Sequence, residues 1–206
     1  MPRYFRAAFG AAAVVFLPAA VYTGFQTASG GGFAWEAAAM LSLHRHAPDW
    51  FYPAAWFLHH TGKAAVAAPM TALAGLWLWK SGRGNAALCL VLSALLATLN
   101  MQLVKYWVQR PRPMLWPRLI EEGGFSFPSG HSSFAAAAAV CLMLVFRAAP
   151  HRRAVWAACV LWAVAMGVSR VYLGVHYPSD VWAGWGNGVM SALLVCGLFG
   201  NAEKRP

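Results

Sequence analysis

The chain contains 206 residues, of which 60% are hydrophobic and only 11% are charged. This composition points to a single domain that crosses a membrane several times, and it argues against a soluble globular protein. The net charge of +10 would suit nucleic acid, but the basic residues alternate with apolar stretches along the chain, so we expect no nucleic-acid partner.

Stretches of about 20 apolar residues are long enough to cross a bilayer as helices. The sequence contains six of them, and it therefore predicts an all-α membrane protein with six transmembrane helices in one domain, residues 1–206. The expected spans cover residues 7–25, 52–79, 85–107, 130–148, 154–173 and 179–199.

The first span resembles a signal peptide, because Arg3 and Arg6 precede its apolar run. Six spans would place both termini on one side of the membrane, so we interpret it as an uncleaved anchor. In the connection that follows, residues 26–51, we expect a flexible turn at Gly30-Gly31-Gly32 and a short interfacial helix within 33–46. This connection could serve as a lid, or it could simply join two spans.

The second span is longer than a bilayer requires. We therefore expect its first turns, which contain His59, His60 and Lys63, to stand out of the membrane. His44 and His46 precede this span, and none of the four histidines shows a spacing that links it to a partner. We interpret all four as interfacial residues.

The four cysteines fall one each in the last four spans, at Cys89, Cys141, Cys159 and Cys196. They show no paired spacing, so the sequence predicts neither disulfides nor a zinc site. We expect them to be small buried hydrophobic residues.

Charges at the ends of the spans predict how the chain is oriented. Basic residues in alternate loops and at the ends mark the cytoplasmic side, namely Arg3, Arg6, Lys80, Arg83, Arg147, Arg152, Arg153, Lys204 and Arg205. Most acidic residues fall on the opposite side, namely Glu36, Asp49, Glu121, Glu122 and Asp180. We therefore expect a protein of the bacterial cytoplasmic membrane whose two termini are both cytoplasmic.

Three polar clusters stand out against this background. They read KYWVQRPRP at 105–113, PSGH at 128–131 and SRVYLGVHYPSD at 169–180. Several cations in or near them lie at the extracytoplasmic ends of the spans, against the positive-inside pattern, and an anionic substrate would explain their position. These cations are Lys105, Arg110, Arg112, Arg118 and Arg170.

The residue types in the clusters suit phosphoryl transfer, in which negative charge spreads over the oxygens of the transferred group. Arg112 and Arg170 can each donate two N–H bonds to phosphate oxygens, and Lys105 supplies a point charge. Ser129 is expected to be the N-cap of the next helix, where the backbone N–H of Gly130 would face an anion.

His176 and Asp180 lie four residues apart around Pro178, which suits the first turn of the last span. A hydrogen bond from one imidazole N–H to the Asp180 carboxylate would orient His176 and leave the other nitrogen free to attack phosphorus. His131 is placed to protonate the departing oxygen and later to activate water.

Each cluster alone has a structural explanation, such as a capped helix start or a basic juxtamembrane stretch. The three clusters occur in order, at helix ends that we expect on one face of the membrane. This arrangement favours a single shared site. A metal site built from His131, His176 and Asp180 is an alternative. Three nearby cations would repel a metal ion, so we expect no metal and no cofactor.

The pattern K-x6-RP, PSGH and SR-x5-H-x3-D resembles the type 2 phosphatidic acid phosphatase family, whose site is similar to that of vanadium haloperoxidases. The resemblance covers about residues 55–200. It implies a six-helix membrane fold, a phosphohistidine intermediate and no metal requirement. It also implies that phosphate is bound by Lys105, Arg112, Ser129, Gly130 and Arg170. It further implies His131 as the acid/base, His176 as the nucleophile and Asp180 as its orienting partner; Arg110 lies outside the pattern and its role stays open.

The expected partners are the lipid bilayer and a lipid phosphate whose tail lies in that bilayer, with no obligate protein partner. The resemblance implies undecaprenyl diphosphate, phosphatidylglycerophosphate, phosphatidic acid or lipid A as candidates, and the compact loops favour undecaprenyl diphosphate. Transfer of the phosphoryl group to another lipid would use the same residues. A non-enzymatic transporter or scaffold is the rival from a different class, but it would not need all three motifs.

Overall fold

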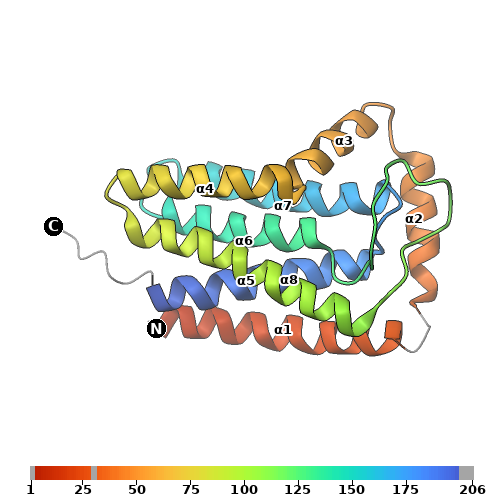
Figure 1. Cartoon of the computed structure of the whole chain (residues 1–206), viewed down its shortest axis with the longest axis horizontal. Helices are drawn as coiled ribbons and strands as arrows, with labels where there is room; N and C mark the ends of the chain where they lie inside the picture. Colours follow the sequence, from red (N-terminus) through yellow and green to blue (C-terminus); the bar gives the residue numbers. More distant parts are fainter. Residues whose placement is uncertain (1–2, 29–31, 200–206) are drawn as a thin grey trace.

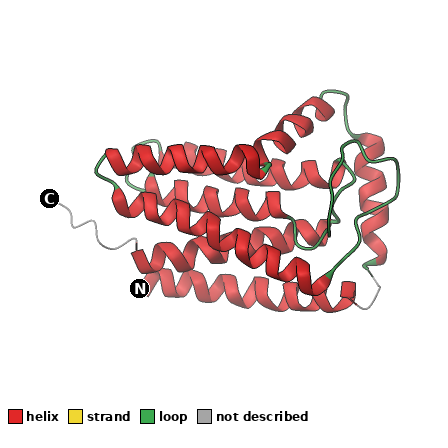
Figure 2. Ribbon diagram, in the orientation of Figure 1, coloured by secondary structure: helices red, strands yellow, loops and turns green. Residues whose placement is uncertain are grey.

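The computed structural model describes residues 3–28 and 32–199. The secondary structure of these residues consists of helices joined by loops, with no strand (Figure 2). The helices are α1 (Arg3–Ala28), α2 (Ala34–His46), α3 (Phe51–Gly62), α4 (Ala64–Lys80), α5 (Gly84–Val108), α6 (Gly130–Val145), α7 (Arg152–Tyr172) and α8 (Pro178–Phe199). The prediction of an all-α protein is confirmed, whereas the expected turn at Gly30-Gly31 and the basic pair Lys204 and Arg205 lie outside the described residues.

The long helices form a bundle in which α8 packs against α1, α5, α6 and α7 (Figure 1). Small residues permit a close approach between α6 and α8. A methyl group at Gly184 of α8 would lie 2.6 Å from the Ser129 carbonyl oxygen, and the alanines at 135–139 of α6 are buried. These small residues bring the start of α8 against the start of α6, and the Ser129 backbone N–H donates to the Asp180 carbonyl oxygen at 2.9 Å.

Four of the described helices are long and apolar enough to cross a membrane, at Arg6–Thr27, Gly84–Val108, Arg152–Tyr172 and Pro178–Phe199. The two other predicted spans correspond to the shorter helices α4, with 17 residues, and α6, with 16 residues. The helices support a membrane protein, and the count of six spans stays a prediction.

The prediction of one continuous helix over 52–79 is wrong. The chain is interrupted at Lys63, whose backbone is extended with φ −63° and ψ 139°, and α3 runs at an angle to α4 (Figure 1). Gly62 precedes the break, and glycine loses more conformational freedom in a helix than any other residue. The break falls in the polar stretch 59–63, which we expected to stand out of the membrane as part of the same helix.

The predicted short helix between the first two spans is present as α2. It packs across the end of the bundle against α7 and α8, and it buries Glu36 and Met40 (Figure 1). All four cysteines are buried, as expected, and none forms a disulfide; the Sγ atoms of Cys141 and Cys196 lie 3.7 Å apart in the core between α6 and α8.

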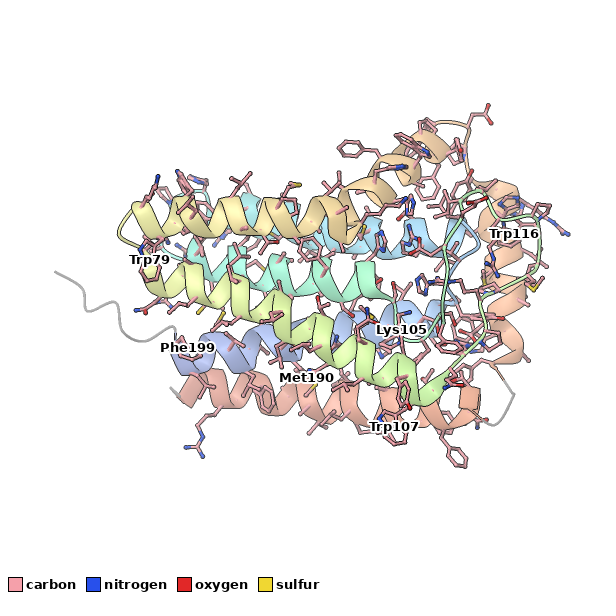
Figure 3. All side chains as sticks on the ribbon, in the orientation of Figure 1. Trp79, Lys105, Trp107, Trp116, Met190 and Phe199 are labelled. Atoms are coloured by element: carbon pink, nitrogen blue, oxygen red, sulfur yellow. The ribbon has the colours of Figure 1, made fainter. Side chains whose placement is uncertain are left out.

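The two ends of the bundle differ. The short turns α4–α5 and α6–α7 lie at one end, where Figure 3 labels Trp79 and Phe199. The opposite end carries α2, α3, the long loop 109–129, to which the labelled Trp116 belongs, and the α7–α8 junction at 173–177. The three sequence clusters all belong to this second end.

Candidate active site

The loop 109–129 and the α7–α8 junction bring the three sequence clusters together. The first cluster lies at the end of α5 and in the loop, the second begins α6, and the third joins α7 to α8. Of the eight predicted site residues, six are buried, namely Arg112, Ser129, His131, Arg170, His176 and Asp180, and two are partly buried, namely Lys105 and Gly130.

His176 lies in the junction with its two ring nitrogens facing opposite charges. Its Nδ1 is 3.4 Å from Asp180 Oδ2, and its Nε2 is 3.2 Å from an Nη of Arg112. The Asp180 oxygen also accepts the Tyr177 backbone N–H at 2.9 Å. The distance to His176 is long for a hydrogen bond, as is common in catalytic sites without substrate.

Burial lowers the pKa of His176 well below its usual value, and the neighbouring Arg112, Arg170 and Lys105 lower this pKa further. The imidazole is therefore neutral at pH 7, and a lone pair is available on one nitrogen.

Arg112 is held in place by backbone carbonyl groups. It donates to Gly123 O at 2.8 Å and Gly124 O at 3.1 Å in the loop, and to Val175 O at 2.9 Å in the junction. Lys105, from α5, donates to the carbonyl oxygens of Phe125 and Ser126. Both cations therefore shape the loop around the site.

The start of α6 has the expected cap. Ser129 Oγ accepts from the Ser132 backbone N–H at 3.4 Å and from its hydroxyl at 3.0 Å. Gly130 is the first helical residue and packs near Met101. The end of the helix that bears His131 is thus directed at the site, where its dipole favours an anion.

His59 contacts both His131 and Arg170. From the sequence we interpreted His59 as a residue of the membrane interface. That interpretation is wrong: His59 is buried, its Nδ1 is 2.9 Å from an Nη of Arg170, and its carbonyl oxygen accepts from His131 Nε2 at 3.0 Å. Burial, with Arg170 as the next cause, lowers the pKa of His59 to about 3. No spacing in the sequence connects His59 with residues 72 and 111 positions further on.

Glu122 is a second residue that sequence reasoning missed. Its carboxylate accepts a hydrogen bond from Arg170 at 2.9 Å and lies 3.6 Å from His59 Nδ1. The Arg170 Nε is buried and has no partner among the described residues. Arg170 is therefore held by His59 and by a loop carboxylate, and it keeps an unused donor.

Arg110, whose role the sequence left open, lies on the other side of Asp180. It donates to Asp180 Oδ1 at 2.7 Å, to Ser179 Oγ at 2.9 Å and to Glu36 Oε2 of α2 at 2.6 Å. The sequence placed Glu36 on the same side of the membrane as the clusters but gave no sign of this contact.

The arrangement offers two imidazoles, several donors for anionic oxygens and a carboxylate behind one imidazole. In the described part of the chain, no group of three His, Cys, Asp or Glu side chains is placed to hold a metal ion. The donors suit an anion with several oxygens, such as a phosphoryl group.

Comparison with known proteins gives one family. The model of the PAP2 superfamily matches residues 86–204. Phosphatidylglycerophosphatase B of Bacillus subtilis (strain 168) is 33% identical over 146 residues, which cover 68% of this chain and 70% of that protein. An undecaprenyl-diphosphatase of Sulfolobus acidocaldarius is 34% identical over 137 residues, which cover 63% of this chain and 61% of that protein.

A solved structure shares the fold over almost the whole chain. The crystal structure of a transmembrane PAP2 type phosphatidylglycerolphosphate phosphatase from Bacillus subtilis superposes with a TM-score of 0.80 at 25% identity. The superposition covers 96% of this chain and 98% of that one.

Proposed function

Because the chain belongs to the PAP2 superfamily and is a phosphoric ester hydrolase, we propose that it hydrolyses a lipid phosphate through a phosphohistidine on His176. The observation that carries the proposal is the position of His176, a buried neutral imidazole between Asp180 and Arg112. A carboxylate on one nitrogen and a phosphate-binding cation beside the other are what a nucleophilic histidine requires.

In the first step, His176 Nε2 forms a bond to phosphorus and the bond from phosphorus to the lipid oxygen breaks. Asp180 stabilises the positive charge that develops on the ring, and His131 donates a proton to the departing oxygen. In the second step, His131 removes a proton from water, the hydroxide attacks phosphorus, and the bond to His176 breaks. Inorganic phosphate leaves and His176 returns to its neutral form.

The phosphoryl oxygens would be bound by Arg112, Arg170, Lys105 and the start of α6 at Ser129 and Gly130. Arg170 is paired with Glu122 in the unliganded site, so substrate oxygens would replace this carboxylate. The unused Arg170 Nε would then supply a further donor.

We propose undecaprenyl diphosphate as the substrate, with phosphatidylglycerophosphate, phosphatidic acid and lipid A as alternatives. The two relatives described above are named undecaprenyl-diphosphatase and phosphatidylglycerophosphatase B, after the first two of these substrates. The loops that connect the described helices are compact, and the longest of them covers residues 109–129. They offer no separate domain for a headgroup, which favours the simple diphosphate. Transfer of the phosphoryl group to a second lipid remains the alternative outcome of the second step.

Phosphate release from a panel of lipid phosphates in detergent tests the proposal, with and without a saturating chelator. We expect release to be fastest with undecaprenyl diphosphate, unaffected by the chelator and inhibited by vanadate, which mimics pentacoordinate phosphorus. Loss of activity with chelator and recovery with one divalent ion would overturn the metal-free mechanism. Release from none of the lipids, with a phosphorylated lipid product instead, would identify a phosphotransferase.

We also propose that the site faces the extracytoplasmic side. The support is the distribution of basic residues, since Lys80, Arg83, Arg147 and Arg152 lie at the end of the bundle opposite the site. In a background without the four native cysteines, a cysteine at Gly123 should react with an impermeant thiol reagent in intact cells. Cysteines at Ser81 or Ala149 should react only after permeabilisation, and the reverse pattern would place the site in the cytoplasm.

A further inference from the structure

Behind His176, three charged side chains form a buried group, and the proposed steps use only one of them, Asp180. Arg110 donates to Asp180 Oδ1 at 2.7 Å and to Glu36 Oε2 at 2.6 Å. The side chains of Glu36, Arg110 and Asp180 are 2%, 4% and 0% exposed. Taking three charges out of water is expensive, and apolar side chains of similar volume are often at least as stabilising. The group therefore needs an explanation other than stability.

Glu36 holds the start of the helix that carries Asp180. Its Oε1 accepts the Ser179 backbone N–H at 3.0 Å and the Ser179 hydroxyl at 2.6 Å. Free N–H groups and the helix dipole make the first turn of α8 a favourable place for a carboxylate. Arg110 bonds the same hydroxyl at 2.9 Å and lies over the Tyr177 ring at 3.7 Å. The first turn of α8 is thus held between α2 and Arg110.

The group also sets the charge beside His176. Asp180 and Arg110 alone would form a neutral pair, and the guanidinium would weaken the effect of the carboxylate on the imidazole. Glu36 adds a second negative charge, so two carboxylates and one guanidinium carry a net charge of −1. This negative charge opposes the cations that face His176 from its other sides, Arg112, Arg170 and Lys105. A histidine ring that receives a phosphoryl group becomes positively charged, and a nearby negative charge stabilises it.

We infer that Glu36 and Arg110 are positioning residues for phosphoryl transfer: they hold Asp180 Oδ2 towards His176 and keep the charge behind the imidazole negative. The inference rests on the proposed function of His176 and Asp180. It makes α2 a part of the hydrolytic site, although Glu36 precedes the region matched by the family model, residues 86–204.

The first test replaces Glu36 with glutamine, which keeps the size of the side chain and removes its charge. Glu36→Gln should lower kcat about tenfold and change KM less than about twofold, because the transition state is affected more than substrate binding. With one negative charge fewer, the protonated imidazole is less stable, so the acid limb of the kcat/KM profile should move to lower pH. Glu36→Asp should recover part of kcat. Glu121→Gln, an exposed carboxylate in the same half of the molecule, is the matched control and should behave as wild type.

The second test is a double-mutant cycle with Asp180→Asn. Because Glu36 acts through Asp180, Glu36→Gln should add less than about twofold to the loss caused by Asp180→Asn. A full tenfold loss in both backgrounds, or an unchanged pH profile in Glu36→Gln, would overturn the inference. Wild-type turnover in Asp180→Asn would instead overturn the proposed function. If Glu36→Gln does not yield folded protein in detergent, Arg110→Lys takes its place in the same cycle, with the same criterion of additivity.

Discussion

Two groups of side chains surround the two site histidines, and they differ in how firmly they are held. The Asp180 cluster consists of Glu36, Arg110, Ser179 and Asp180 behind His176, and its charged side chains are at most 4% exposed. The Glu122 cluster consists of His59, Glu122 and Arg170 next to His131, and its carboxylate is 22% exposed on a loop. Each cluster contains an arginine paired with a carboxylate.

The difference lies in which partner can be exchanged. In the Asp180 cluster, helices α2 and α8 supply the carboxylates, and both are bonded to backbone N–H groups as well as to Arg110. In the Glu122 cluster, the carboxylate has bonds only to side chains among the described residues, and it comes from the loop 109–129. A site for phosphoryl transfer needs both properties, because the nucleophile has to stay in place while the phosphate-binding cations change partners.

The largest expected effect comes from removing the proposed nucleophile, His176, which the Asp180 cluster faces. His176→Ala should lower phosphate release by about a thousandfold or more, because the variant lacks the imidazole on which we propose that the covalent intermediate forms. Asp180→Asn should also lower turnover severely, since the neutral amide cannot stabilise the charged ring. Lipid phosphatase assays in detergent, together with a melting curve that shows folded protein, provide the measurement. Near-wild-type turnover in His176→Ala would show that His176 is not the nucleophile.

Removing the acid/base group should have the next largest effect. His131→Gln should lower turnover with a lipid phosphate by about 10²–10⁴-fold. With p-nitrophenyl phosphate, whose leaving group departs without a proton, the loss in the first step should be much smaller. The comparison of burst phases on the two substrates measures this difference. An equal loss of the burst on both would show that His131 is not the group that protonates the leaving oxygen.

The pH profile provides a finer test of the charges around His176. Arg112 lies 3.2 Å from His176 Nε2 and is among the groups that lower the pKa of this histidine. A lowered pKa keeps the imidazole neutral to lower pH, so the acid limb of wild-type kcat/KM should lie below pH 6.5. Arg112→Gln removes the positive charge, raises the pKa of His176 and should move this limb to higher pH. A limb that stays in place would show that another group controls it.

The smallest expected effect concerns the exchangeable carboxylate. Because Glu122 competes with an anion for Arg170, Glu122→Gln should bind vanadate a few-fold more tightly, within the range typical of partly exposed ion pairs. Inhibition curves at constant pH measure the change, and Glu121→Gln serves as the control. Weaker vanadate binding in Glu122→Gln would mean that Glu122 supports the anion site by holding Arg170, and the two clusters would then be equally fixed.

The sequence predicted the part of this arrangement that depends on local pattern. Ser129 caps α6, Pro178 begins α8, and the spacing of His176 and Asp180 places them together, all as expected from helix periodicity and capping rules. The three clusters could be assigned to one end because charged residues at the ends of apolar helices reveal the orientation of each helix. The all-helical fold and the family followed from the same patterns.

Contacts between distant segments could not be predicted in this way. Glu36 meets Arg110 across 74 positions, and His59 meets Arg170 across 111 positions. Neither Glu36 nor His59 belongs to one of the three polar clusters of the sequence, and a lone acid or histidine near a helix end looks like an ordinary interfacial residue. The direction of α3 depends on the backbone at Lys63; the polar stretch 59–63 is visible in the sequence, but its composition does not give the angle between the two helices.

That break has a consequence for the evolution of the site. Gly62, the last residue of α3, lies so close to His131 that a Cβ atom at this position would overlap the imidazole. A descendant sequence that replaces this glycine with any larger residue has to move His131 or realign α3, and either change alters the catalytic geometry. The role proposed for His131 therefore also constrains a residue without functional groups, and we expect homologues with the same site geometry to carry a glycine three positions after the residue that corresponds to His59.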